Sequence, residues 1–291
     1  METSYILTAL KTKSAAWVIH NLNPEHVAQA LDASFAVGAN ESEKTLIDRA
    51  VDAFPLYGRI LRLKAIYLAQ ENRPRDAINL LSLVPPKDDY FLSCMELMGL
   101  IFTRNLHFDK GIAIYSMIIP KVADEFSLSF IYYQRSICFQ YKGNYIDALN
   151  DCLNACRLCP EDSLYYEDAV LNVHLAILKG QINQIRPLVV SLEQICTDFL
   201  IDYYCFGPSL FLVEMAFLRN NIDRIDEIFA EFAESELSDV DILSKKVKNY
   251  HRFLKQLSKI PRPISHKSVS EFRGKKDTLE IFVAMEQHGK L

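Results

Sequence analysis

The chain has 291 residues, half of them apolar, and a formal net charge of −5. This apolar share supports a large core and excludes a disordered chain. The 9 glycines make up about 3% of the residues, whereas roughly 7% is usual. The deficit argues against all-β folds, dinucleotide-binding folds and glycine-rich phosphate loops, and the negative charge argues against a wholly basic nucleic-acid binder.

The N-terminal segment, Glu2 to Asn21, has amphipathic helical spacing and is expected to form one capping helix. It lacks the pattern of a secretory signal, because Glu2 replaces the usual basic lead and Lys11 and Lys13 interrupt the apolar run. No segment of the sequence reaches the roughly 18 consecutive apolar residues that span a bilayer. We therefore expect a soluble, intracellular protein of the cytoplasm.

Residues 58–162 contain three predicted helix pairs. Each pair has one small residue in its first helix and one in its second, and both series recur at steps of 34 and 37 residues. The first series is Ala65, Gly99 and Ser136, and the second is Ala77, Gly111 and Ala148. Small side chains let two helix backbones approach closely, and the matched steps indicate repeated units at 58–91, 92–125 and 129–162.

The unit at 129–162 has the clearest pattern. Its two helices are joined at Lys142-Gly143-Asn144, where glycine supplies a positive φ, and Pro160 ends the second helix. Weaker units are expected at 24–57, 166–199 and 206–239, and in the last two larger residues replace the small crossing residues. The segment from Ser238 to Ser258 is expected to form a second capping helix.

Paired antiparallel helices with a three-residue turn and small crossing residues resemble the tetratricopeptide repeat (TPR). The resemblance implies an all-α, right-handed superhelix of about six helix pairs with terminal capping helices, spanning residues 1–258. It also implies that the first helix of each unit lines a concave groove. The groove residues expected on this basis are Arg59, Arg62, Ile66, Glu96, Leu100, Phe130, Tyr133, Ile137, Gln140, Val170, His174, Leu210, Glu214 and Phe217.

The chain changes character after Ser258. Residues 259–291 are expected to form a linker and a short C-terminal segment, because the stretch has prolines and serines but little apolar periodicity. Between positions 255 and 276 seven basic residues accompany one acid, Glu271. The basic residues are Lys255, Lys259, Arg262, Lys267, Arg273, Lys275 and Lys276.

The seven cysteines are an odd number, which does not suit a closed disulfide framework. Cys152, Cys156 and Cys159 have the spacing of the iron–sulfur motif in radical S-adenosylmethionine enzymes. All three, however, fall on the apolar face of a predicted helix, where core packing is the favoured interpretation. The histidines are scattered, and neither a nucleophile elbow nor a phosphate loop is present. We expect no enzyme activity, no metal and no other cofactor.

These patterns predict a scaffold or adaptor that binds another protein, as a peptide or amphipathic helix, in the groove. A clamp for acidic chaperone tails is disfavoured, because Arg59 and Arg62 are the only basic groove residues and no asparagine accompanies them. The alternative is a regulatory repeat protein, which acts on a nucleic-acid-directed process or is autoinhibited through the basic tail. Simple charge attraction would also allow the tail to contact anionic lipid, and self-association stays open.

Overall fold

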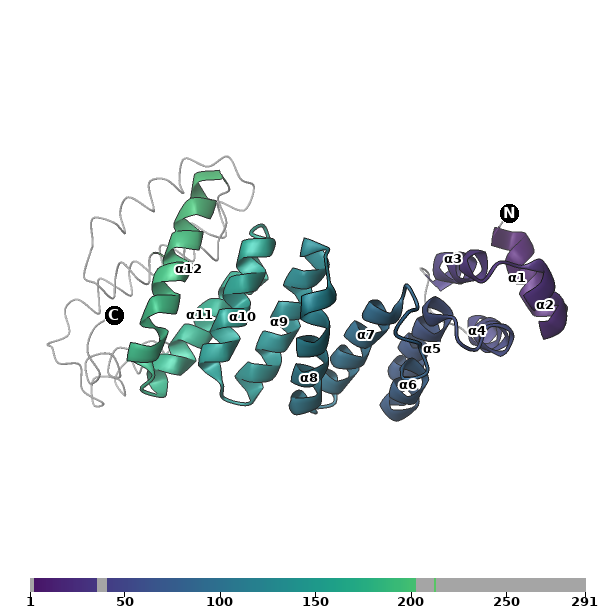
Figure 1. Ribbon diagram of the computed structural model, residues 1–291, viewed down its shortest axis with the longest axis horizontal. Coiled ribbons are helices and arrows are strands. Elements are labelled where there is room, and N and C mark those ends of the chain that lie inside the picture. Colours follow the sequence, from purple (N-terminus) through teal and green to yellow (C-terminus); the bar gives the residue numbers. More distant parts are fainter. Residues whose placement is uncertain (1–2, 36–40, 203–211, 213–291) are drawn as a thin grey trace, which may run out of the picture. The chain divides into compact units, whose positions relative to one another are not determined.

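The computed structural model describes residues 3–35, 41–202 and 212, and the regular structure within them is helical (Figure 1). Internal contacts divide the chain into two compact units, Met1–Ala123 and Asp124–Leu291. Unit 1 contains α1 (Thr3–Thr12), α2 (Ala15–Asn21), α3 (Pro24–Phe35), α4 (Glu41–Ala53), α5 (Gly58–Gln70), α6 (Pro74–Leu81), α7 (Phe91–Arg104), α8 (Phe108–Ile118) and the 3₁₀ helix η1 (Ile119–Lys121). The described helices of unit 2 are α9 (Glu125–Tyr141), α10 (Tyr145–Leu158), α11 (Ser163–Leu178) and α12 (Ile182–Asp202).

The N-terminal segment differs from the single helix expected over Glu2 to Asn21. It forms two helices, α1 and α2, because Ser14 adopts an extended conformation and its side chain accepts a hydrogen bond from the Trp17 backbone N–H at 3.3 Å. Serine is a preferred N-cap residue, and a new helix starts where it satisfies an otherwise unpaired N–H. Both helices then pack on the following pair, α1 on α3 and α4, and α2 on α4.

Unit 1 is built from helices that pair and then stack. Within it α3 packs on α4, α5 on α6 and α7 on α8, and α5 also contacts α3, α4 and α7. The predicted crossing residues Ala65, Ala77, Gly99 and Gly111 are all buried. A Cβ atom added at Gly99 would lie 2.6 Å from the ring of Tyr115 on α8. The requirement for a small residue there is therefore a direct steric one.

Four turns between paired helices share one backbone geometry. Their central residues are Asn72, Leu106, Gly143 and Gly180, all with a φ between 60° and 77°. In each turn the following residue donates its N–H to a carbonyl five positions earlier, at 2.8–2.9 Å, as in a Schellman motif. The positive φ predicted for Gly143 is confirmed, and the turn recurs in both units at intervals of 34 and 37 residues.

Unit 2 repeats the pairing, with α9 on α10 and α11 on α12, and α10 also contacts α11 and α12. An internal ion pair joins α9 to α10, in which Arg135 contacts both carboxylate oxygens of the buried Asp151 at 2.7 and 2.8 Å. Because both hydrogen bonds are made, the buried charge is matched.

The cysteines of the 152–159 motif lie in the core of unit 2 as free, buried thiols. Burial raises the pKa of Cys152 to about 12 and that of Cys156 well above its usual value. These two thiols are therefore protonated at neutral pH and poor ligands or nucleophiles. Within the described residues no group of three or more His, Cys, Asp or Glu could hold a metal ion. The same residues include no helix that is both long and apolar enough to cross a bilayer.

Candidate partner-binding site

Five of the expected groove residues lie on α5 and α7 in unit 1, and the structure gives them different roles. Arg59 is held within the unit: its guanidinium forms ion pairs with Glu25 and Asp32 of α3, and its Nε lies 2.9 Å from an Asp32 oxygen. The hydroxyl of Tyr90 donates to Glu25 at 3.0 Å, and a second tyrosine, Tyr57, donates to the same carboxylate oxygen. Arg59 therefore joins α3 to α5.

Arg62 of α5 lies three residues after Arg59, and Glu96 lies on α7. Both side chains are half-buried. The Nε of Arg62 is buried and makes no hydrogen bond with any described residue. Burial raises the pKa of Glu96, and the nearby charge of Arg62 acts in the opposite direction. A partly buried carboxyl group with a raised pKa reduces the stability of the folded state, and such groups are common at functional sites.

The next turn of both helices borders a cavity. Ile66 of α5 and Leu100 of α7, two expected groove residues, line one space of about 270 Å³. The other lining residues are Ala69, Gln70, Asn72, Pro74, Leu97, Ile101, Arg104 and Asn105. Arg104 is the charged residue of this lining; it is exposed and forms no ion pair in the part of the chain that the structure describes. The lining of the cavity thus combines apolar side chains with one cation.

The groove residues expected in unit 2 are more engaged in holding helices together. The ring of Tyr133 on α9 is buried and lies 5.0 Å from that of Tyr165 on α11, measured between centroids. Burial raises the pKa of Tyr133, and its interaction with Asp168 adds to this shift. The amide of Gln140 donates to Asn172 of α11 at 3.3 Å. These contacts join α9 to α11.

Three other residues of that set, Phe130 and Ile137 on α9 and Val170 on α11, are half-buried. His174 belongs to α11, but its side chain is not among those described. Several expected sites lie outside the described residues and stay predictions: Leu210, Glu214, Phe217, the unit at 206–239, the helix at 238–258 and the basic residues from Lys255 to Lys276.

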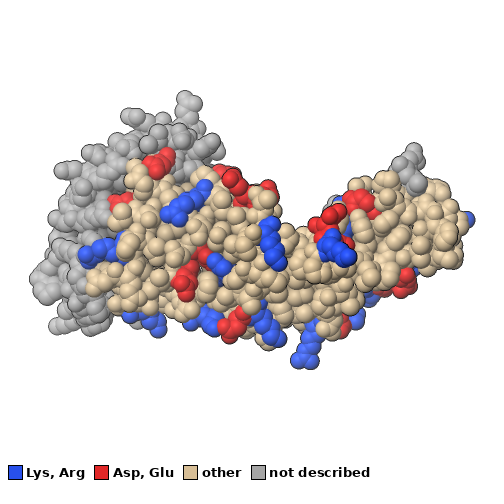
Figure 2. Space-filling view, in the orientation of Figure 1, with Lys and Arg blue, Asp and Glu red and all other residues tan. Residues whose placement is uncertain are grey.

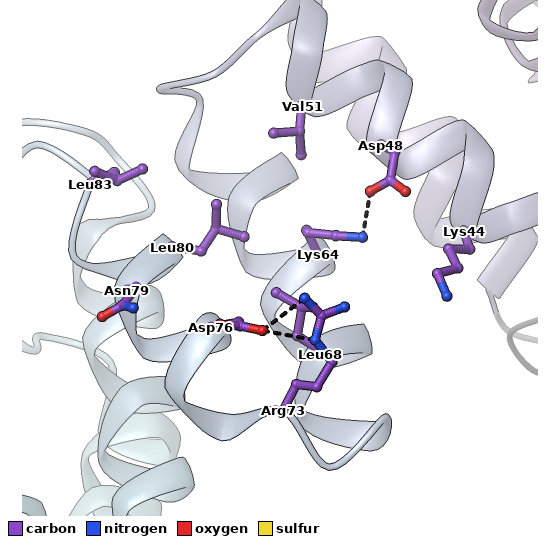
Figure 3. Close-up of a pocket in the computed structure, with 10 residues that line it drawn as sticks. All are labelled: Lys44, Asp48, Val51, Lys64, Leu68, Arg73, Asp76, Asn79, Leu80 and Leu83. Carbon is purple, nitrogen blue, oxygen red and sulfur yellow. Dashed lines mark hydrogen bonds and ion pairs between the residues drawn. The ribbon is translucent and has the colours of Figure 1, made fainter.

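A groove between α4, α5 and α6 was not predicted from the sequence (Figure 3). It has a volume of about 610 Å³, and its walls carry two ion pairs, Lys64 with Asp48 and Arg73 with Asp76, the latter at 2.7 Å. Its lining consists of Lys44, Asp48, Val51, Lys64, Leu68, Arg73, Asp76, Asn79, Leu80 and Leu83. The available signal was an apolar pair, Leu80 and Leu83, which amphipathic spacing does not assign to the core.

Charged side chains are dispersed over the described surface in Figure 2, where basic and acidic residues are interspersed on the visible face. On that face the described residues form no broad field of one sign. A continuous basic surface is what phosphate backbones require. The visible face of the described residues shows no such surface.

No protein-family model matches the chain, and no curated protein matches it. Among solved structures, the C-terminal part of a TPR repeat-containing protein from Cytophaga hutchinsonii is 12% identical, with a TM-score of 0.53. That match covers 83% of this chain and 99% of the other. PilF of Pseudomonas aeruginosa is 10% identical with a TM-score of 0.50, over 77% of this chain and 97% of the other.

Identities this low show the fold alone. The helix pairs, the buried small residues at Gly99 and Ser136, and the recurring left-handed turns are the local features of that fold. The chain therefore has an all-α helical-repeat fold similar to that of the Cytophaga TPR structure, and the expected resemblance in fold is confirmed.

Proposed function

We propose that the protein is a non-enzymatic scaffold or adaptor that binds a segment of another protein on the α5–α7 face of unit 1. The observation that carries this proposal is the 270 Å³ cavity, because Ile66 and Leu100, chosen from the repeat pattern, both line it. A space of this size accepts one apolar side chain of a partner. Apolar contacts would supply most of the affinity.

The polar lining supports a partner segment with a charged or polar residue next to its apolar one. Arg104 brings to the lining a cation that forms no ion pair with the described residues, and Gln70 and Asn72 bring hydrogen-bonding groups. A partner with an apolar residue and a nearby Asp or Glu would satisfy both features. Glu96 and Arg62, one turn away on the same helices, would then limit which residue precedes the apolar one.

The experiment is selection from a phage-displayed library of random peptides with the full chain, followed by measurement of the selected peptides in solution. We expect an enriched apolar residue with an acidic residue close to it. Ala69→Leu, which adds a larger side chain to the lining, should weaken binding at least about tenfold, which is roughly 1.4 kcal/mol. Arg104→Gln should weaken it about two- to fivefold, since exposed ion pairs contribute ~0.2–1 kcal/mol.

Two substitutions of the same chemistry serve as controls. Ala113→Leu adds the same side chain on the exposed face of α8, and Arg157→Gln removes the same charge on α10. Both variants should bind the selected peptides as the wild type does. The cavity would be refuted as the binding site by either of two results. One is an equal loss of binding in Ala69→Leu and Ala113→Leu, and the other is unchanged affinity of the selected peptides for Ala69→Leu.

A further inference from the structure

The turn between α7 and α8 has an unfavourable residue at its centre. Leu106 has a φ of 62°, in the left-handed region that glycine adopts freely and that leucine adopts only with strain. The equivalent turns of the chain have Gly143, Gly180 and Asn72 at this position, the last with a φ of 60°. Glycine or asparagine would make the same turn at lower cost, so the backbone geometry does not account for a leucine.

Packing within the chain does not account for the leucine either. Its side chain is 71% exposed, more than that of any other large apolar residue whose side chain the structure describes. An apolar side chain stabilises the folded state through the area that it removes from water, and this one removes little. Exposure alone is common on protein surfaces. Exposure at a strained backbone position is different, because residues in strained conformations cluster at ligand-binding sites.

The turn adjoins the cavity of the proposed function. Arg104 and Asn105, the two residues before Leu106, both line that cavity. So does Asn72, the central residue of the turn between α5 and α6. Leu106 is therefore next to the lining in the chain, with its Cα about 3.8 Å from that of Asn105. Leu56, which is 57% exposed in the same unit, has no lining residue beside it in the sequence.

The surroundings of Leu106 favour one kind of occupant. Its neighbours Arg104, Asn105 and His107 are polar and exposed, so it is not part of a continuous apolar stretch. A stable dimer interface buries about 800 Å² on each partner, and membrane anchoring by a helix needs a whole apolar face. One leucine beside an apolar cavity suits instead a further residue of a segment that already occupies the cavity.

We infer that Leu106 is a second apolar contact for the segment that binds in the α5–α7 cavity. This inference rests on the proposed function. One apolar side chain of the partner would enter the cavity, and a second would pack on Leu106 and cover it. An extended segment rises about 3.3 Å per residue, so the two apolar residues of the partner should lie within about four positions of each other.

The test repeats the peptide selection with two forms of the full chain, the wild type and Leu106→Asn. Asparagine is chosen because Asn72 already has the same left-handed φ in this chain, so the turn should be kept. Phage-displayed peptides selected on the wild type should have two apolar positions at a constant separation, and those selected on Leu106→Asn should retain only one. The wild-type peptides should bind Leu106→Asn at least about fivefold more weakly, because less apolar area is covered. The thermal stability of this variant should be equal to that of the wild type or higher.

Matched variants separate an apolar contact from a change in the turn. Leu106→Met keeps an apolar side chain at the strained position, and it should bind the wild-type peptides as the wild type does. Leu56→Asn makes the same change as Leu106→Asn at an exposed leucine that does not line the cavity, and it should have no effect. Serine in place of the second apolar residue of a peptide should weaken its binding to the wild type but not to Leu106→Asn, because that contact is already absent there.

The outcomes distinguish this inference from the proposed function. Peptides that are weakened by Ala69→Leu but not by Leu106→Asn would overturn the contact at Leu106 and leave the cavity as the binding site. Peptides that are weakened by Leu106→Asn but not by Ala69→Leu would overturn both, since Leu106 would then belong to a different site. Equal effects of Leu106→Asn and Leu56→Asn would also contradict the inference. Self-association of the wild type that Leu106→Asn abolishes, measured by sedimentation velocity, would make a second copy of the chain the occupant instead.

Discussion

At the residue scale, the two arginines expected at the start of the groove are used differently because of their surroundings. Arg59 forms ion pairs with two carboxylates on α3, those of Glu25 and Asp32. Arg62, nearly one turn later, has a buried Nε without a described partner and lies near Glu96. The same residue type on the same helix face therefore holds the fold at one position and borders the candidate site at the other.

Glu96→Gln tests whether that carboxyl is retained at a cost to stability. Burial raises its pKa above the unfolded value, so ionised Glu96 disfavours the folded state at pH 7. We expect Glu96→Gln to unfold at higher urea concentration than the wild type at pH 7. The gain should fade as pH falls through the folded pKa and vanish below the unfolded value of about 4.5, where both side chains are neutral.

The control is Glu161→Gln, which removes a carboxyl at an exposed position in the turn before α11. Urea titrations at several pH values would compare the three proteins. A stabilisation by Glu96→Gln that is the same at every pH would contradict the ionic explanation. A loss of stability at pH 7 would mean that the interaction with Arg62 outweighs the burial of Glu96.

At the scale of elements, the turn between paired helices is the most regular feature of both units. It needs a left-handed residue at its centre, and glycine provides this without steric strain at Gly143 and Gly180. Unit 1 instead has Asn72, which tolerates the conformation, and Leu106, which does not. The turn hydrogen bonds and the packing of α7 on α8 hold Leu106 in this strained conformation.

Leu106→Gly should therefore stabilise the protein. The side chain is 71% exposed, so its removal loses little packing, and relief of the positive φ should gain about 0.5–1 kcal/mol. Gly143→Ala is the matched opposite change and should lose about 1 kcal/mol, although no atom lies within 4 Å of the added Cβ. Thermal unfolding of both variants would check the signs, and a destabilised Leu106→Gly would show that the leucine makes an important contact.

At the scale of the whole molecule, the first unit contains a continuous core of its own. Buried residues from Ile6 to Tyr67 form one hydrophobic cluster, and α7 with α8 extends the stack through contacts to α5 and α6. In helical repeats each pair depends mainly on its neighbours, so a stack with enough pairs folds without the remainder. The cavity on which the proposed function rests lies in this unit.

A chain ending at Ala123 is expected to fold on its own. Circular dichroism should show high helix content, and urea should unfold the fragment in one cooperative transition. A chain ending at Asn105 is the comparison, because it lacks α8 and uncovers Gly99 where Tyr115 packs. It should be less stable. If the fragment ending at Ala123 were unfolded, unit 1 would depend on residues beyond it.

Much of the repeat architecture could be predicted because its signals are local. The glycine at position 143 predicts a turn, and the structure gives it a positive φ. The small residues Gly99 and Ser136 predict close helix crossings, and both are buried in the structure. The break at Ser14 was missed because apolar spacing continues across it. A capping hydrogen bond depends on the backbone conformation of one residue, which the spacing does not report.

The sequence by itself determined the class of fold, the helix pairs and the positions that cross, since each follows from residues close together in the chain. The tertiary structure alone decided which surface residues are available. Tyr90 donates a hydrogen bond to Glu25, 65 positions away, and Arg59 pairs with the same glutamate, so these side chains are engaged within unit 1. The α4–α6 groove likewise depends on how three helices pack around shared ion pairs, and such long-range contacts leave no periodic pattern in the sequence.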